Sequence, residues 1–431
     1  MTDLFDGKGG VAASGRPALA RLLPLPVAEF AENYWSQRPL AARAADLDQD
    51  FSDLFDSQAV DELIGRRGLR APFLRVAKDG VTLPDSAFTR PGGVGAAIGD
   101  QVSDDRLLEL FASGSTIVLQ GLHRTWGPLI DFAGDLGADL GHPVQVNAYV
   151  TPAQNKGFSA HYDVHDVFVL QIAGTKRWLI RQPVHPLPLR DQTWERRRAA
   201  VEAAASTDPL LDLVLAPGDC LYLPRGYIHS AAALGEVSIH LTIGIHPWTR
   251  THLAEQLVQA AVADLASVAA VRDSLPLGLD WDREALDPGE VERVKAALID
   301  AVQAIDPARI ANALATAHRG SQRAAPVGPL AQVAAADSLT DEDILRLRPR
   351  LAARLMDGPE SAVLVTRAGR RTIEPVDLAT IRKLLADGHV DVATVGMDVA
   401  RRLLLAGLVT RHTQVNGLSS PAAPDGAGNL D

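Results

Sequence analysis

The segment GFSAHYDVHDVFVLQ (residues 157–171) and the later segment LAPGDCLYLPRGYIHSA (residues 215–231) decide the fold and the candidate site of this chain. His161 and Asp163 are two residues apart on a predicted strand, so we expect both side chains to project from the same face. One imidazole and one carboxylate supply two ligands of a 2-His-1-carboxylate triad, the arrangement that leaves open positions on Fe(II).

A second pair with the same spacing provides an internal control. His389 and Asp391 follow Gly388 at a predicted helix end, and no third ligand accompanies them. Because the chain has 12 histidines, a His-x-Asp pair also arises by chance. We therefore interpret the second pair as a solvated helix end, and the first pair needs further support.

That support comes from His229. A predicted turn at residues 217–219 leads into a short strand, and Pro224 and Gly226 then form a second turn before the histidine. Such a succession suits a double-stranded β-helix that presents a third ligand opposite the first two. Cys220 is the only cysteine, which excludes a cysteine-based zinc site. The sequence thus predicts a metal site made by His161, Asp163 and His229.

The segments around these residues predict the domain organisation. Short β-branched runs separated by Gly and Pro occur between residues 116 and 245, a pattern typical of a sandwich or barrel. A charged helical insertion is expected within residues 184–216. After Pro247 the pattern becomes that of amphipathic helices. We expect a flexible N-terminus (1–25), a barrel domain (26–248), a helical domain (249–320), a linker (321–337), a winged-helix-like domain (338–412) and a disordered tail (413–431).

Composition restricts the class of protein. The 431 residues are 47% hydrophobic and 22% charged, as in ordinary globular proteins. The net charge of −11 lacks the basic footprint of a nucleic-acid-binding protein. The N-terminus does not resemble a signal peptide, and no apolar run is long enough to cross a membrane. Together with the single cysteine, these features predict a cytoplasmic protein.

Several blocks in a fixed order resemble one family. NAYVTP (147–152), HYDVHDVFVLQIAGTKRW (161–178), PGDCLYLPRGYIH (217–229) and SIHLTIG (238–244) are similar to the ribosomal-oxygenase (cupin-4) branch of the JmjC-type 2-oxoglutarate oxygenases. The resemblance implies an α+β chain: a double-stranded β-helix (JmjC/cupin-type jelly roll), then a helical dimerisation domain, then a winged-helix-like domain. It also implies a homodimer.

The resemblance further implies how the site works. Fe(II) would be held by His161, Asp163 and His229, with 2-oxoglutarate as co-substrate and O2 as oxidant. Lys176 matches the position of the cation that pairs the distal carboxylate of 2-oxoglutarate. Asn147, Tyr149 and Thr242 match co-substrate-pocket positions. Gly244 departs from the pattern, because some relatives carry a hydroxyl-bearing residue there.

The substrate implied by the resemblance is a protein or peptide side chain, with arginine or histidine of a ribosomal protein as the first expectation. N-methyl-lysine demethylation uses the same chemistry and remains an alternative. A second alternative is a DNA-binding regulator whose barrel senses a metal or metabolite. Residues 337–411 hold 12 Lys/Arg and 11 Asp/Glu, whereas a winged helix that grips phosphates usually has a basic face. We therefore expect no nucleic-acid partner.

Overall fold

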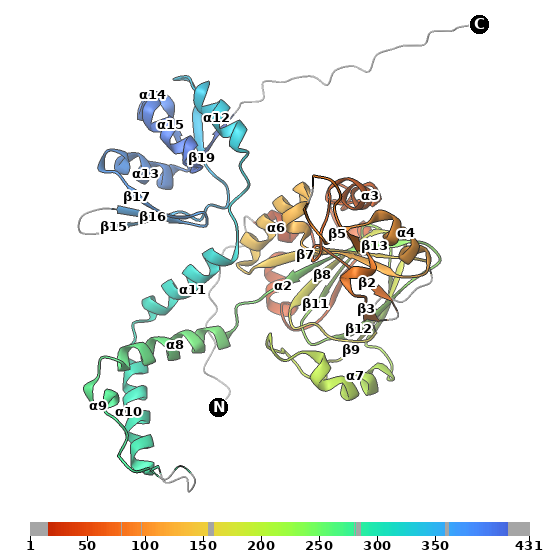
Figure 1. The fold of residues 1–431 in the computed structure, drawn as a ribbon, viewed down its shortest axis with the longest axis horizontal. Helices are drawn as coiled ribbons and strands as arrows, with labels where there is room; N and C mark the ends of the chain where they lie inside the picture. The colour runs from red at the N-terminus through yellow and green to blue at the C-terminus, as the bar shows by residue number, and fades with distance from the viewer. Residues whose placement is uncertain are drawn as a thin grey trace. The chain divides into compact units, whose positions relative to one another are not determined.

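A computed structural model describes residues 16–412, apart from residues 79, 96, 154–158, 280, 282–285 and 358–361. The chain divides into two compact units, Met1–Ser321 and Gln322–Asp431. Figure 1 shows the first unit as strands covered by helices, followed by a run of helices. The predicted disordered tail (413–431) and most of the predicted flexible N-terminus lie outside the described residues.

The larger sheet of the first unit has eight strands, and all neighbouring strands in it are antiparallel. In order across the sheet they are β1 (Leu40–Ala42), β11 (Cys220–Leu223), β8 (Asp166–Ala173), β13 (Ser238–Ile245), β7 (Val144–Thr151), β6 (Thr116–Leu119), β2 (Leu74–Lys78) and β3 (Val81–Thr82). Strands far apart in the sequence are therefore neighbours, as in a jelly roll.

A smaller antiparallel sheet has the order β10 (Leu211–Leu215), β9 (Lys176–Arg181), β12 (Ile228–Ala233). Side chains of both sheets share one apolar cluster, which includes Val169 from the large sheet and Ile180 from the small one. The two sheets therefore face each other, and the mixed architecture with a large antiparallel sheet agrees with the predicted JmjC/cupin-type jelly roll.

The outer face of the large sheet is covered by helices α3 (Ser57–Arg66), α4 (Asp104–Ala112), α5 (Leu122–Thr125) and α6 (Gly127–Leu140) (Figure 1). Side chains along each strand point alternately to the two faces of the sheet, so every second residue packs against these helices. In β13, Ile239, Leu241 and Ile243 belong to the helix-covered core, whereas His240 and Thr242 line a cavity between the sheets. The strand period of two thus separates a structural face from a functional face.

The beginning of the described chain is ordered, which corrects the expectation of flexibility up to residue 25. Helix α1 (Pro17–Ala20) and the turn after it bury Leu19 and Leu22, and the backbone N–H of Leu19 donates to Asp139. Helix α2 (Val27–Asn33) follows, with Phe30 in the core. Burial of these apolar side chains offsets the entropy cost of ordering the segment.

Two expectations about the strand region were wrong in detail. His161 and Asp163 do not lie on a strand; they precede β8, and only His161 makes an isolated bridge. The insertion contains the expected helix, α7 (Arg198–Ala205), but its end forms β10. Leu213 and Leu215 alternate with polar or exposed neighbours there, the pattern of an edge strand.

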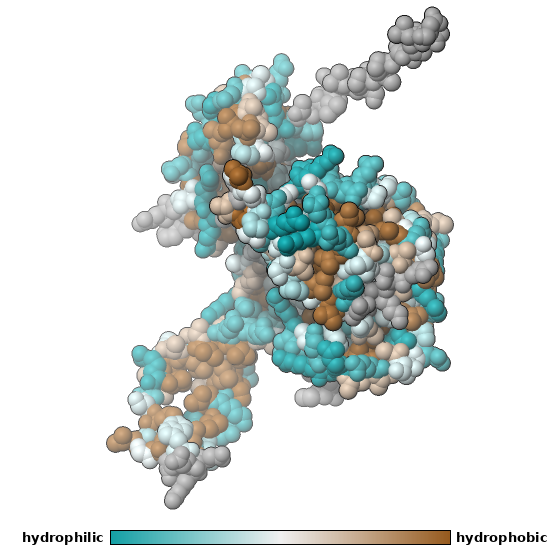
Figure 2. All heavy atoms as spheres, turned by 45° about the vertical axis from the view of Figure 1, so that its right-hand side comes forward, coloured by the Kyte–Doolittle hydropathy of each residue, from teal (hydrophilic) through white to brown (hydrophobic). Residues whose placement is uncertain are grey.

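The run of helices after the barrel consists of α8 (Arg250–Leu265), α9 (Ala269–Arg272), α10 (Pro288–Ala304) and α11 (Pro307–Ser321). Asp287 caps α10 as its sequence position suggests, accepting from the Gly289 N–H. Ala261, Ile305 and Ile310 form the small core of this segment. Apolar side chains nevertheless remain exposed on it, and Figure 2 shows them gathered over these helices: Leu253, Val258, Val262, Val291, Val294 and Ile299.

The second unit contains α12 (Pro329–Asp337), β14 (Ile344–Leu347), β15 (Arg354–Asp357), β16 (Ala362–Thr366), β17 (Gly369–Ile373), α13 (Pro375–Asp387), β18 (His389–Asp391), α14 (Val392–Val395), α15 (Met397–Leu405) and β19 (Val409–His412). Part of the predicted linker is therefore a helix, because Pro329 suits a first helical turn and Ala336 packs into the core. The winged-helix assignment stays a prediction. The pair interpreted as a solvated helix end, His389 and Asp391, instead forms β18 directly after the α13 capping residue Gly388, although His389 is exposed as expected.

A search of the described helices found none that combines the length and the apolar character of a membrane span.

Candidate metal centre and adjoining pockets

Three side chains that the sequence analysis singled out meet at the mouth of the barrel. One ligand atom each from His161, Asp163 and His229 lies within 4.8 Å of the other two. His229 belongs to β12, whereas the other two residues belong to the loop before β8. The loop reaches β12 through its backbone, because His161 and His229 form an antiparallel bridge. Residues 68 positions apart in the sequence are thus held side by side.

Backbone carbonyls fix the orientation of both imidazoles. Nδ1 of His161 lies 2.7 Å from the carbonyl oxygen of Ser159, and Nδ1 of His229 lies 3.1 Å from that of Tyr227. A carbonyl can only accept, so each Nδ1 carries a hydrogen, and in the neutral imidazole this leaves the lone pair on Nε2. Nε2 of His229 faces Oδ2 of Asp163 at 3.7 Å. The lone pairs needed for a metal therefore converge.

The charge states also suit a metal ion. Burial lowers the pKa of His229 to about 4, so its imidazole is neutral at pH 7. Burial favours the protonated form of Asp163, but the neighbouring histidines His165, His229 and His161 outweigh it and hold the pKa below its usual range. An ionised carboxylate and neutral imidazoles are the forms that bind a divalent cation.

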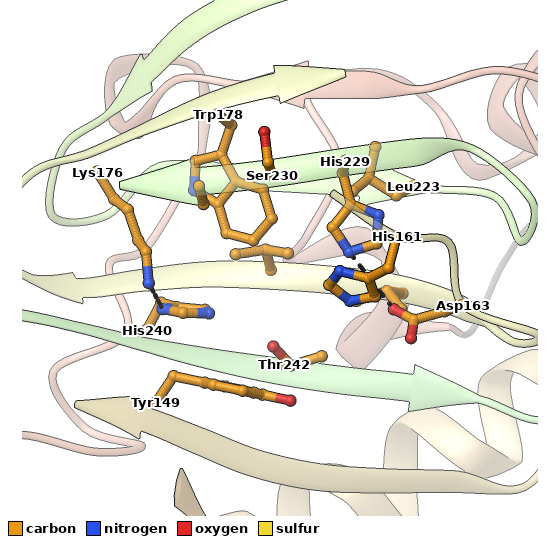
Figure 3. Close-up of a pocket in the computed structure, with 13 residues that line it drawn as sticks. Tyr149, His161, Asp163, Lys176, Trp178, Leu223, His229, Ser230, His240 and Thr242 are labelled. Carbon is orange, nitrogen blue, oxygen red and sulfur yellow. Dashed lines mark hydrogen bonds and ion pairs between the residues drawn. The ribbon is translucent and has the colours of Figure 1, made fainter. Parts of the chain in front are cut away.

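A narrow cavity runs from this triad into the barrel, with Lys176 at its far end (Figure 3). Between the two ends lie Trp178, Thr242 and Tyr149 (Figure 3). Apolar side chains complete the walls: Val167, Val169, Leu223 and Ala231. We call this space the inner cavity.

Lys176 is a buried cation in an apolar wall. Its side chain starts β9, only 2% of the residue is exposed, and Nζ lies 3.2 Å from Oγ1 of Thr151 and 3.5 Å from Nδ1 of His240. Burial lowers its pKa to about 7. In the described part of the chain, no carboxylate lies within ion-pair distance of Nζ. The ammonium therefore lacks the anion that normally accompanies a buried lysine.

The remaining predicted pocket residues divide between two spaces. Tyr149 and Thr242 line the inner cavity, and the Tyr149 ring stacks on His240 with centroids 4.9 Å apart. Asn147 shares the strand face of Tyr149, as predicted, but it lines a neighbouring pocket, where its Oδ1 accepts from the Gly121 N–H at 3.1 Å. The co-substrate role of Asn147 stays a prediction.

This neighbouring space, which we call the polar pocket, has a volume of about 470 Å³. It shares Tyr149, Asp163 and Thr242 with the inner cavity, so the two spaces meet at one ligand of the triad, Asp163. Its other lining residues are Pro72, Phe73, Arg75, Gln120, Gly121, His123, Gln145, Asn147 and His165. The sequence offers no signal for Arg75, which arrives on β2 from a segment without a motif.

Two residues that follow the loop ligands in the sequence have partners of their own. Asp166, the first residue of β8, accepts from Ser36 Oγ, the Tyr222 hydroxyl and the Arg225 backbone. It holds the segment before β1 against the barrel. Of the two interpretations that its sequence position allows, a residue beside the metal ligands or an exposed loop histidine, His165 fits the first better: it is half-buried, with Nε2 3.4 Å from Nε2 of Gln145.

The insertion contributes a residue to the rim that the sequence analysis did not single out. Trp194 lies close to the metal site, with its ring centroid 6.3 Å from that of His161. Arg198 stacks over the same indole, 4.5 Å from its centroid. The insertion is therefore part of the surface around the mouth of the barrel.

Comparison with known proteins identifies the central region. The family model described as the JmjC domain matches residues 136–253. The chain is 29% identical over 274 residues to the bifunctional lysine-specific demethylase and histidyl-hydroxylase NO66 of Drosophila persimilis, which covers 62% of this chain and 37% of that protein. It is 27% identical over 295 residues to ribosomal oxygenase 1 of Gallus gallus, covering 66% of this chain and 46% of that one. The chain thus spans less than half the length of these curated relatives.

Solved structures share the fold. A crystal structure of Escherichia coli ribosomal oxygenase YcfD has a TM-score of 0.51 at 15% identity, and the match covers 90% of this chain and 98% of that one. A second YcfD structure, in complex with cobalt and succinic acid, also has a TM-score of 0.51 at 15% identity. The similarity therefore extends from the barrel through most of the chain.

Proposed function

We propose that this chain, whose residues 136–253 are a JmjC domain, is an Fe(II)- and 2-oxoglutarate-dependent oxygenase that hydroxylates a protein or peptide side chain. The observation that carries the proposal is the pair of features at the two ends of the inner cavity. A converging two-imidazole, one-carboxylate donor set lies at one end, and Lys176 lies at the other without a carboxylate partner among the described residues. A dicarboxylate with a metal-chelating end matches both.

The donor set fits Fe(II) on chemical grounds. Two neutral imidazoles and one carboxylate are typical of non-haem Fe(II) oxygenases, and they leave positions for other ligands. His161, Asp163 and His229 would hold the ion. When bound, Fe(II) with 2-oxoglutarate and O2 supplies the oxidising power that converts a C–H bond to C–OH, with release of succinate and CO2.

The protein's own groups position the co-substrate and exclude water. The Lys176 ammonium pairs the distal carboxylate, and Thr151 and His240 hold its Nζ. Because the cavity walls are apolar and buried, this ion pair is stronger than it would be in water. Tyr149 and Thr242 lie between Lys176 and the triad (Figure 3), where their hydroxyls can donate to the bound dicarboxylate.

For the substrate, we propose histidine or arginine of a ribosomal protein. The support is the activity for which similar proteins are named: one is a histidyl-hydroxylase, and another is a ribosomal oxygenase. The polar pocket reaches the triad at Asp163, so a substrate side chain in it would lie next to the metal site. N-methyl-lysine demethylation is a second candidate, because the first of these relatives is also called a lysine-specific demethylase. Among the described residues, however, the polar pocket offers only Phe73 and Tyr149 as aromatic walls.

We also propose that the chain is a homodimer that associates through the helical segment. The exposed valines and leucine of α8, with those of α10, form an apolar surface that water solvates poorly. A second copy would cover it. The second unit would then be a winged-helix-like module that serves substrate docking rather than DNA binding, in line with its near-neutral composition.

The test is an anaerobic titration of Fe(II) and 2-oxoglutarate into metal-free protein, followed by the visible metal-to-ligand charge-transfer band. Wild-type protein should develop the band, His229→Ala should not, and Lys176→Ala should need a much higher concentration of 2-oxoglutarate. Lys295→Ala, on the exposed surface of α10, is the matched lysine control and should behave as wild type. Bound metal without a band in wild-type protein would contradict the proposal.

A further inference from the structure

The polar pocket abuts the metal centre, so its chemistry selects the side chain that can be oxidised. Asp163 belongs both to the triad and to the lining of this pocket. Tyr149 and Thr242 line both this pocket and the inner cavity. If 2-oxoglutarate occupies the inner cavity, the substrate must approach through the polar pocket. The inference therefore rests on the proposed function, which places 2-oxoglutarate in the inner cavity.

The pocket presents a positive charge. Nη2 of Arg75 lies 3.4 Å from the Tyr149 hydroxyl, and a guanidinium stays protonated at any physiological pH. The Arg75 charge also acts on Asp163. Asp163 is the one carboxylate among the described residues that line the pocket, and the metal would engage it. A cationic substrate would therefore meet a like charge and find no free carboxylate in this lining.

Amide, imidazole and hydroxyl groups make up most of the remaining lining. Gln145 and His165 approach each other to 3.4 Å, with Asn147 next on the same face of β7. Amide and imidazole groups both donate and accept, so they can pair with another amide or imidazole without a charge. A site built this way rejects groups that leave its polar atoms unpaired.

Gly244 provides the space for this arrangement. A Cβ atom at this position would lie 3.1 Å from Nε2 of Gln145 and 3.2 Å from Nε2 of His165. Both distances are tighter than ordinary contacts, so a larger residue would displace the pair. Gly244, which departs from the family pattern, therefore leaves room for the side chains of Gln145 and His165.

We propose that Arg75, Gln145 and His165 form a specificity subsite that accepts an uncharged, hydrogen-bonding side chain, an imidazole or a carboxamide, and rejects arginine and N-methyl-lysine. Arg75 excludes cations by repulsion, and the Gln145–His165 pair recognises the neutral polar group. This selects among the substrate classes that the proposed function leaves open.

The experiment uses the full-length Fe(II)-loaded protein and five synthetic peptide pools. Each pool has degenerate flanks and one fixed central residue: His, Asn, Gln, Arg or Nε-methyl-Lys. The readouts are peptide-stimulated succinate formation above the peptide-free rate and the product mass: a gain of about 16 Da for hydroxylation, or a loss of about 14 Da for demethylation of the methyl-Lys pool. The His and carboxamide pools should together exceed the Arg and methyl-Lys pools by about tenfold or more. Stimulation by the Arg pool equal to or above the others, or no stimulation by the neutral pools, would overturn the inference.

Variants link the preference to the subsite. Arg75→Glu should shift the ratio of Arg-pool to His-pool stimulation by about tenfold toward Arg, and Arg75→Gln should shift it less in the same direction. Lys78→Glu lies on the same strand but outside the pocket and should leave the ratio unchanged. Gly244→Ala should weaken the His-pool response, whereas Gly127→Ala, with nothing within 4 Å of its Cβ, should not.

The charge-transfer band separates this inference from the proposed function. A variant that retains the band and the peptide-free turnover has an intact centre, so a changed ratio reports the subsite alone. An unchanged ratio in both Arg75 variants with the band intact would contradict the subsite while leaving the oxygenase assignment in place. Absence of the band in wild-type protein would instead reject the oxygenase itself.

Discussion

The main chains of His161 and His229 are joined by two hydrogen bonds, from the His161 N–H to the His229 carbonyl at 3.1 Å and in the reverse direction at 2.8 Å. The turn before His229 adds a third link, because the Gly226 N–H donates to the Asp163 carbonyl at 3.0 Å. The three candidate metal ligands are thus tied together by backbone rather than by side chains.

Gly226→Ala should therefore damage the site through the backbone. Gly226 has φ of 90°, and a Cβ atom would lie 2.7 Å from the His185 carbonyl and 2.9 Å from Cδ of Pro188. We expect weaker Co(II) binding by isothermal titration calorimetry and a lower melting temperature. Gly235→Ala is the matched control: its φ of 75° imposes a similar backbone strain, but nothing lies within 4 Å. Equal effects of the two substitutions would refute the steric explanation.

Binding of 2-oxoglutarate should weaken as the pH rises above about 7. Lys176 has a pKa lowered to about 7 by burial, so it is charged below that pH and neutral above it in the empty cavity. Only the ammonium pairs a carboxylate, so affinity should fall toward tenfold per pH unit above the pKa. Calorimetry at pH 6.5 and 8.5, in buffers of different ionisation enthalpy, should also detect proton uptake at the higher pH. Lys176→Met should bind weakly with little pH dependence; a slope like that of wild type would exclude Lys176 as its source.

Asp166 should be essential for the stability of the first unit. It is fully buried and accepts hydrogen bonds from three residues, including Arg225. Asp166→Ala leaves a buried guanidinium without its partner, which typically costs roughly 3–5 kcal/mol of unfolding free energy. Urea titration followed by tryptophan fluorescence measures it. Asp212→Ala removes an exposed Arg177–Asp212 pair and should change stability little. A similar small loss for Asp166→Ala would be the contrary result.

Association of two chains should depend on the apolar surface of the helical segment. Val262 on α8 is 55% exposed, and a carboxylate there would have to be desolvated in a dimer interface. Val262→Asp should convert a dimer into a monomer in sedimentation velocity experiments. Val376→Asp on α13, where the valine is 71% exposed in the second unit, should leave the mass unchanged. A wild-type monomer, or a dimer that survives Val262→Asp, would reject this interface.

The site was predictable from sequence where its parts lie in short contiguous blocks. His161 and Asp163 are two residues apart, and Lys176 follows on the strand after β8. Their short separation in the sequence therefore indicates that they belong to one site. The turn-forming residues before His229 likewise predicted a turn and a strand. The assignment of His161 and Asp163 to a strand was wrong because the pairing with β12 that fixes them is a long-range contact.

The parts that escaped prediction are those set by tertiary packing. Arg75 and Gln145 reach the polar pocket from β2 and β7, strands whose sequences show alternation but no functional spacing. The Ala-rich sequence of helix α12 is typical of a linker. The segment is helical because Ala336 packs against the core of the second unit. The role of Asp166 could not be predicted from its neighbours, because its partner Ser36 lies 130 residues away in the sequence.

The hydrogen bond between Ser36 and Asp166 limits how short a fragment that contains the JmjC-matching region can be. A fragment cut at residues 136 and 253 would lose β1 and β6, exposing the edges of β11 and β7 to aggregation, and would remove Ser36 from a buried carboxylate. The matched sequence block is therefore smaller than the folded unit, whose core includes residues from Ala18 onward. Transfer of the JmjC-matching region to another protein would have to include the helices and strands between Ala18 and residue 135 as well.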